Sequence, residues 1–203
     1  MPCTPCQMCP DPRPAPVVAD LCGRESRAER ARVSTVCSER HGVAPRILVP
    51  VPTLLIVHHT ASPTLHSLFD AVRTGASDPA IEGVTVAHKA ALEATAVDVL
   101  DADGYVLGTP ANLGYMAGAM KHFFDTIYYP CLESTIGRPY GVYVHGNNDT
   151  TGAQRAIETI TTGLQWRLAK EPVNIVGEPS RADLEACVEL GAALAAGLSL
   201  AVG

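Results

Sequence analysis

The sequence of 203 residues lacks the short motifs that mark several common classes of α/β protein. It contains no Walker-type loop with its lysine and no G-x-G-x-x-G run, which disfavours a P-loop nucleotidase and a classical dinucleotide-binding domain. G-x-S-x-G is also absent, which disfavours an α/β-hydrolase. A site for a phosphorylated ligand in this chain would therefore need a loop of another kind.

Long apolar runs are missing as well. The apolar segment at residues 190–202 is too short to span a bilayer, and the first residues hold no positively charged stretch followed by an apolar run. We therefore expect a cytoplasmic protein with no membrane partner. The seven cysteines are expected to be reduced thiols, because a disulfide framework belongs to an oxidising compartment.

Charge is sparse and unevenly distributed. Charged residues make up 18% of the chain and the net charge is −6. Residues 1–46 hold seven arginines against five acidic residues, whereas the remainder holds eight lysines and arginines against sixteen acidic residues, a net charge of −8. The remainder has no basic stripe with interleaved aromatic residues, so we expect no nucleic-acid partner.

The composition changes after residue 46. The first residues, MPCTPCQMCPDPRPAP, are rich in proline and cysteine, so we predict a flexible arm over residues 1–46 and one folded domain over residues 47–203. Cys3, Cys6 and Cys9 have a spacing that is typical of iron–sulfur or zinc ligation, but no local pattern fixes a fourth ligand. We predict no metal site.

Five short apolar runs alternate with helical patterns from residue 52 onward. The runs are TLLIVHH (53–59), GVTVAHK (83–89), GYVLGT (104–109), YGVYVHG (140–146) and VNIVG (173–177). They predict an α/β protein with a five-stranded parallel sheet of order 2-1-3-4-5 and helices on both faces, a three-layer sandwich. Ser180 and Asp183 fit a capping box for the last helix, and Cys131 and Cys187 are predicted to be buried.

The loops after the first, third and fourth of these strands should meet at one edge of the sheet. The first loop supplies Thr60, Ser62 and Thr64 at the start of a helix, where free N–H groups favour an anion; the alternative is an ordinary capped helix. The loop after the fourth strand, HGNNDTTG, is polar and glycine-rich, which suits either ligand binding or plain turn formation.

The loop after the third strand is GTPANLGYMAG, residues 108–118. We expect the strand to break at Pro110 and the chain to resume as a helix. Gly114 allows close backbone approach, Asn112 offers hydrogen bonds, and Leu113 and Tyr115 offer apolar surface for a flat ring. The alternative is that Gly118 and the following methionines only pack the helix on the sheet.

The stretch GTPANLGYMAGAMKHFFD, residues 108–125, resembles the second flavin loop of flavodoxin-like NAD(P)H:quinone oxidoreductases and NADPH-dependent FMN reductases. Their pattern is G-[ST]-P, a small loop, G-x-M-[AS]-G, and a helix ending in F, a hydrophobic residue and D. The resemblance extends more weakly over residues 52–198. It implies a flavodoxin-like fold with FMN as the cofactor.

The resemblance also implies which residues hold the flavin. The phosphate would be bound by Thr60, Ser62 and Thr64, although Ser62 and Pro63 stand near the place where flavodoxins usually have a glycine. One side of the ring would be bordered by Pro110, Ala111, Asn112, Leu113, Gly114 and Tyr115, and the other side by His145, Gly146 and Asn147.

The implied function is an FMN-dependent oxidoreductase that passes electrons from NADPH or NADH to a quinone or a similar small acceptor. The flavin carries the reaction, so no acid–base pair is required, and Tyr115 and His145 are the candidate catalytic residues. The alternative is an electron carrier or flavin-binding module with no nicotinamide reaction of its own. A receiver domain is disfavoured because His58 and His59 stand where it needs acidic residues. A homo-oligomer remains open, since a neighbouring subunit often completes the flavin pocket in such proteins.

Overall fold

The structure is a computed structural model, and it describes residues 51–201. Its strands are β1 (Thr53–His58), β2 (Thr85–Ala90), β3 (Gly104–Asn112), β4 (Tyr115–Met116), β5 (Pro139–Gly146), β6 (Arg167–Leu168) and β7 (Val173–Val176). Its helices are α1 (Pro63–Ala76), α2 (Ala96–Asp101), α3 (Gly118–Cys131), α4 (Thr151–Gly163) and α5 (Arg181–Leu200). The predicted arm with Cys3, Cys6 and Cys9 lies outside the described residues, so the arm and its boundary stay predictions.

The long strands form one parallel sheet. β2, β1, β3 and β5 lie side by side in that order, and two short strands share the far side of β5, because β6 pairs with its start and β7 with its end. The antiparallel β4 pairs only with the end of β3. If the two-residue strands β4 and β6 are left out, the order along the chain is 2-1-3-4-5, so the predicted fold is confirmed.

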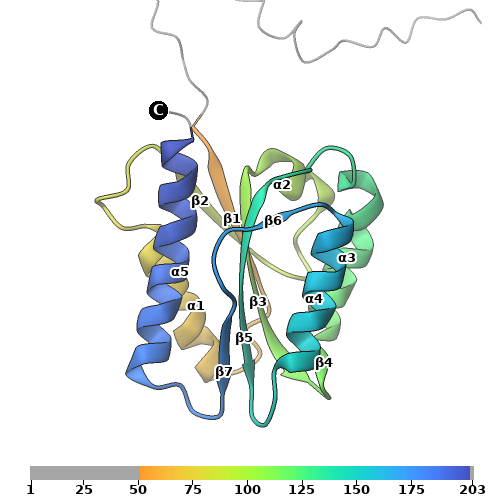
Figure 1. Cartoon of the computed structure of the whole chain (residues 1–203), viewed down its shortest axis with the longest axis vertical. Helices are drawn as coiled ribbons and strands as arrows, with labels where there is room; N and C mark the ends of the chain where they lie inside the picture. Colours follow the sequence, from red (N-terminus) through yellow and green to blue (C-terminus); the bar gives the residue numbers. More distant parts are fainter. Residues whose placement is uncertain (1–50, 202–203) are drawn as a thin grey trace, which may run out of the picture. The chain divides into compact units, whose positions relative to one another are not determined.

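Helices cover both faces of the sheet, with α1 and α5 on one side and α2, α3 and α4 on the other (Figure 1). Along β1, Leu54 and Ile56 pack toward the first pair, whereas Leu55 and Val57 pack toward the other three. A strand covered on both faces reads as one continuous apolar run, which is why β1 was visible in the sequence. Cys131 and Cys187 are fully buried, as predicted.

The helices α1 and α5 approach each other closely at two glycines. A Cβ atom on Gly75 would lie 1.9 Å from the carbonyl oxygen of Val188, and one on Gly191 would lie 2.0 Å from the carbonyl oxygen of Val72. Any larger residue would push the helices apart. None of the helices in residues 51–201 combines the length and apolar character needed to cross a bilayer.

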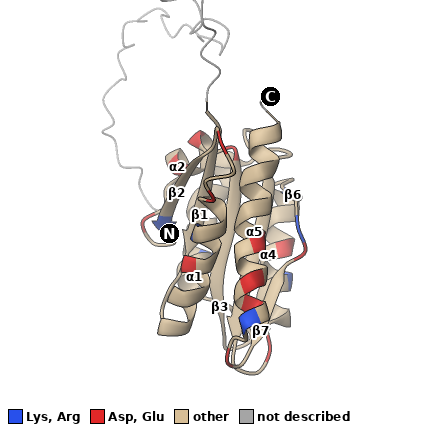
Figure 2. Cartoon of the chain, turned by 90° about the vertical axis from the view of Figure 1, so that its left-hand side faces the viewer, with Lys and Arg blue, Asp and Glu red and all other residues tan. Residues whose placement is uncertain are grey.

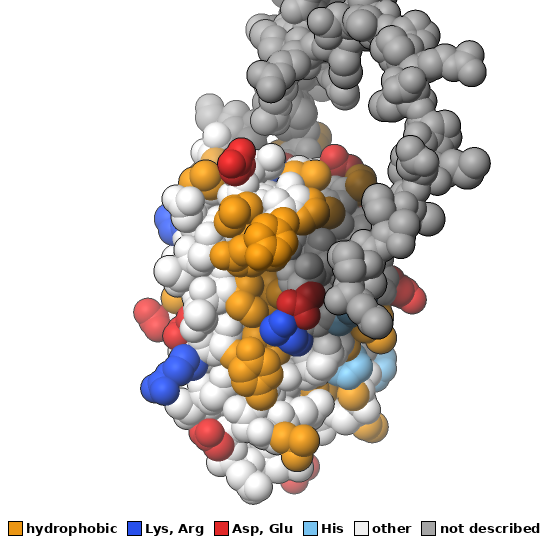
Figure 3. Space-filling view, turned by 90° about the vertical axis from the view of Figure 1, so that its right-hand side faces the viewer, with side chains coloured by type: hydrophobic (Ala, Val, Ile, Leu, Met, Phe, Trp, Pro, Cys, Tyr) orange, Lys and Arg blue, Asp and Glu red, His pale blue; other side chains and the backbone are white. Residues whose placement is uncertain are grey.

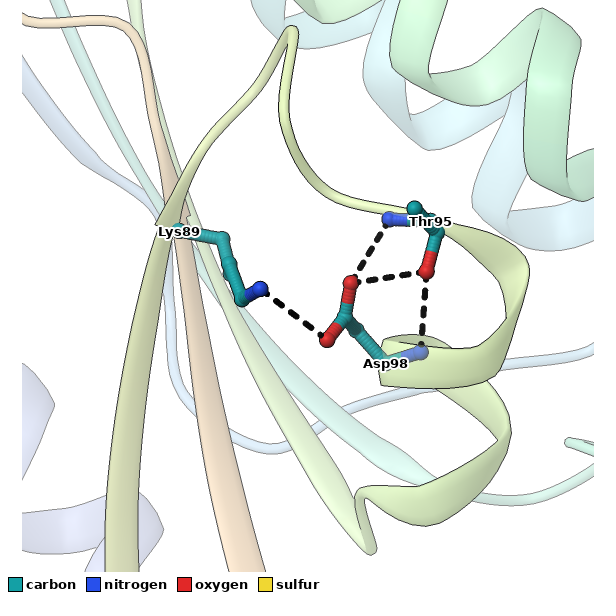
Figure 4. Close-up of polar contacts among 3 residues, drawn as sticks. All are labelled: Lys89, Thr95 and Asp98. Carbon is teal, nitrogen blue, oxygen red and sulfur yellow. Dashed lines mark hydrogen bonds and ion pairs between the residues drawn. The ribbon is translucent and has the colours of Figure 1, made fainter.

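Helix α2 was not identified from the sequence. It is six residues long and buries only Val99 fully, so it leaves no periodic apolar stripe. Its start is held by a capping box in which Thr95 and Asp98 bond each other, and Lys89 reaches across from β2 to the same carboxylate, at 3.5 Å (Figure 4). Its last carbonyl groups accept hydrogen bonds from the Arg138 guanidinium.

Candidate functional site

The three loops after β1, β3 and β5 enclose a cavity of about 340 Å³ at the carboxyl edge of the sheet. Its lining residues are Ala61, Ser62, Thr64, Leu65, Pro110, Ala111, Asn112, His145, Gly146 and Asn147. The strand order reverses between β1 and β3 at this edge, which is the place where open α/β sheets bind ligands.

The structure brings together most of the site residues expected from the sequence. Those that line the cavity are Ser62, Thr64, Pro110, Ala111, Asn112, His145, Gly146 and Asn147. The other four, Thr60, Leu113, Gly114 and Tyr115, do not line it. Ala61 and Leu65 also line the cavity. They were not predicted, because alanine and leucine have no functional group that indicates a binding site.

The first loop presents the start of α1 to the cavity. Ser62 caps the helix, since its Oγ accepts a hydrogen bond from the amide of Leu65 at 3.3 Å, and Pro63 is the first helical residue. The first turn holds no acidic residue, so its N–H groups and the helix dipole favour an anion. The Thr60 side chain contacts His58 instead of the cavity, with its Oγ1 3.4 Å from Nδ1 of His58.

His58 ends β1 among other histidines. Its ring centroid lies 4.1 Å from that of Phe69 and 6.2 Å from that of His88. Burial, followed by the charges of His88, His66 and His59, lowers the pKa of His58 to about 4. The imidazole beneath the first loop is therefore neutral at pH 7.

The predicted break at Pro110 is wrong, because β3 runs on to Asn112. The carbonyl of Gly108 accepts a hydrogen bond from the amide of His59, on the side of β1. Bonding sides alternate along a parallel strand, so the nitrogen of Pro110 faces the same side, where β1 has already ended. The missing N–H of Pro110 therefore costs the sheet no hydrogen bond.

A tight hairpin, β3 to β4, separates the strand from α3. Asn112 pairs with Tyr115, and the two residues between them have positive φ angles, 52° at Leu113 and 74° at Gly114. Such a pair of angles is typical of two-residue hairpin turns and suits glycine better than leucine. The Leu113 side chain is fully exposed, at 107%, so the tip of the hairpin projects into solvent.

Thr109 holds this hairpin to the helix and was not singled out from the sequence. Its buried Oγ1 accepts a hydrogen bond from the amide of Ala117 at 3.1 Å and donates one to the carbonyl of Pro110 at 3.1 Å. Ala117, the residue before α3, has no side-chain cap of its own. Thr109 therefore supplies the cap from the neighbouring strand.

The third loop is fixed by His145 and Gly146. Nε2 of the buried His145 lies 2.8 Å from the carbonyl oxygen of Gly177, which can only accept, so Nε2 donates this hydrogen bond. A Cβ atom on Gly146 would lie 2.5 Å from the carbonyl oxygen of Asp149. The tight turn thus requires glycine at this position.

A larger cavity of about 480 Å³ lies at the opposite, amino-terminal edge of the sheet, where Pro52 and Pro139 border it. Ligands of parallel α/β sheets bind beyond the carboxyl ends, and the Arg138 side chain at this cavity is already bonded to α2. We therefore assign the site to the smaller cavity. Residues 51–201 contain no group of three metal-ligating side chains that could hold an ion.

Comparisons with known proteins agree with the fold described above. No protein-family model matches the sequence. A flavodoxin from Aquifex aeolicus (strain VF5) is 36% identical over 74 residues, which is 36% of this chain and 39% of that flavodoxin.

Two solved structures have the same fold. A flavodoxin from the domain Archaea matches with a TM-score of 0.62 and 17% identity, over 72% of this chain and 98% of that one. The flavodoxin, WrbA-like protein from Agrobacterium tumefaciens matches with a TM-score of 0.60 and 17% identity, over 75% of this chain and 99% of that one. The chain therefore has a flavodoxin-like fold.

Proposed function

We propose that the chain is an FMN-dependent oxidoreductase that takes electrons from NADPH or NADH and passes them to a quinone or a similar small acceptor. The observation that carries the proposal is the single cavity at the strand-order reversal, to which all three loops contribute. The similarity to flavodoxins supports a flavin as the ligand.

The cavity lining fits FMN. Hydroxyl groups of Ser62 and Thr64 stand at the acid-free start of α1 and suit a phosphate, whereas Pro110 and Ala111 offer apolar surface beside the amide of Asn112. The volume of about 340 Å³ lies in the range of small-molecule sites, about 300–1,000 Å³. The cavity is therefore large enough to receive most of a flavin ring.

The protein's own residues would position the cofactor and its partners. When bound, the flavin would accept a hydride from the nicotinamide and release two electrons to a quinone, which takes up two protons to become the hydroquinone. His145 donates a hydrogen bond from Nε2 to the carbonyl of Gly177, which fixes the orientation of its ring. This fixed orientation suits a hydrogen bond to a polar group on the flavin edge.

An electron carrier that uses the same cavity is the second candidate. Eight lysines and arginines stand against sixteen acidic residues after residue 46, and acidic residues recur along α5 (Figure 2). Excess negative charge suits docking to a basic redox partner. Anaerobic addition of NADPH or NADH separates the candidates, since rapid bleaching of the bound flavin supports the enzyme and no bleaching supports the carrier.

The visible spectrum of the protein incubated with excess FMN tests both candidates. We expect stoichiometric binding, with flavin absorption that stays with the protein on gel filtration. Asn112→Trp fills the cavity and should lower flavin occupancy at least tenfold, whereas Leu113→Trp, one residue further along the same hairpin but in solvent, should leave it unchanged. A wild-type protein that stays colourless would refute flavin binding.

A further inference from the structure

Another hollow, of about 330 Å³, lies on the face that carries α3 and α4. Its lining residues are Tyr115, Lys121, Gly152, Arg155, Ala156, Thr159 and Ile160, and we call it the α3–α4 groove. Hydrophobic side chains run down this face, with a basic side chain on either side of the lower part of the run (Figure 3). The groove therefore combines apolar surface with positive charge.

Tyr115, which the sequence pattern placed beside the flavin, belongs to this groove. Its side chain is 44% exposed, although its cross-strand partner Asn112 lines the flavin cavity. The hairpin is thus shared, with β3 bordering the cavity and β4 bordering the groove. An exposed tyrosine ring beside Ala156 and Ile160 suits the stacking of a flat ring.

Arg155 is exceptional among the cations of residues 51–201. Five of the eight lysines and arginines there are in ion pairs, among them Lys121 with Asp125, and Arg138 is bonded to backbone carbonyls. Within the described part of the chain, the two remaining cations, Arg155 and Arg167, have neither a carboxylate within ion-pair distance nor a side-chain hydrogen bond. An exposed guanidinium without a carboxylate partner, in a domain of net charge −8, is available for an anionic ligand.

We infer that the α3–α4 groove binds the adenosine phosphate portion of the nicotinamide dinucleotide, with the adenine on Tyr115 and phosphate oxygens on Arg155. The inference rests on the proposed function. Neighbouring strands lie about 5 Å apart, so a dinucleotide that crosses the hairpin reaches both the groove and the flavin cavity. The nicotinamide ring can then lie at the cavity while the phosphates stay on the guanidinium.

Anaerobic stopped-flow reduction of the FMN-loaded protein tests this inference with NADPH, NADH and reduced nicotinamide mononucleotide. Arg155→Gln should raise the dissociation constant of the dinucleotides about tenfold, the loss typical of one charge-assisted hydrogen bond, without changing the limiting rate. The mononucleotide lacks the adenosine phosphate, so its kinetics should not change. Arg155→Lys should recover part of the affinity, because the positive charge is retained.

Arg167→Gln is the matched control, since it removes another arginine that has no ion pair and that borders the cavity at the opposite edge of the sheet. Unchanged dinucleotide affinity in Arg155→Gln, or an equal loss with the mononucleotide or in the control, would overturn the inference. If no nicotinamide reduces the flavin, the proposed reaction fails, and equilibrium titration with adenosine 2′,5′-bisphosphate decides the groove. Binding that depends on Arg155 supports it, and absence of binding overturns it.

Discussion

Tyr143 is tightly packed, yet its hydroxyl group forms no hydrogen bond within the described residues. This hydroxyl is fully buried. The ring lies over Gly108, where a Cβ atom would be 2.0 Å from Cζ, so the glycine makes room for the tyrosine. Burial strongly raises the pKa of Tyr143, and the phenol stays neutral.

We expect Tyr143→Phe to raise the free energy of unfolding by about 1 kcal/mol, because it removes a buried hydroxyl that forms no bond. Tyr105→Phe is the matched control. The Tyr105 hydroxyl donates to the carbonyl of Val99 at 2.8 Å and accepts from Arg138 at 3.0 Å, so its loss should lower stability by about 1–3 kcal/mol. Urea unfolding followed by circular dichroism measures both changes, and a destabilised Tyr143→Phe would show that the hydroxyl is satisfied.

Site residues could be predicted where a loop directly follows a strand. Ser62 and His145 line the same cavity, because the carboxyl ends of parallel strands meet at one edge, and their role in binding stays a prediction. Tyr115 does not line that cavity, because the turn at Leu113 and Gly114 reverses the chain before the helix begins. The amino-acid sequence alone does not distinguish a loop that surrounds a ligand from a hairpin that separates two hollows.

At the scale of elements, the contact of α1 with α5 depends on glycine. Gly191→Ala should lower the free energy of unfolding by about 1–3 kcal/mol, because its Cβ would meet the backbone of Val72 at 2.0 Å. Gly197→Ala lies on the same helix with nothing within 4 Å, so it should raise stability by about 1 kcal/mol through helix propensity alone. Chemical denaturation of the two variants compares them directly, and similar values for both would contradict the close packing.

The strong elements were predictable because they are buried on a regular period. All five main strands and the capping box of Ser180 and Asp183 were visible as patterns in the sequence. Helix α2 and the strands β4 and β6 were missed, since six and two residues are too few to establish a period. Their positions depend on tertiary partners such as Arg138, which bonds the end of α2.

At the scale of the whole molecule, His58 links stability to pH. Its pKa in the folded protein, about 4, lies below the ordinary value of 6.5, so the unfolded chain binds the proton first as the pH falls. Stability should therefore decrease as the pH falls from about 6.5 to about 4, and this contribution is fully present above that window. His58→Gln should flatten the profile, whereas His122→Gln, an exposed histidine on α3, should not. Thermal unfolding across the window measures this, and an unchanged slope in His58→Gln would contradict the assignment.

The contact between the hairpin and α4 links the two hollows mechanically. A Cβ atom on Gly152 would lie 2.0 Å from the carbonyl oxygen of Gly114, so the tip of the hairpin lies against the first turn of α4 with backbone alone between them. A methyl group added at Gly152 would push the hairpin away from α4. Since the hairpin borders both the cavity at the carboxyl edge and the α3–α4 groove, a single added carbon atom should change the shape of both hollows.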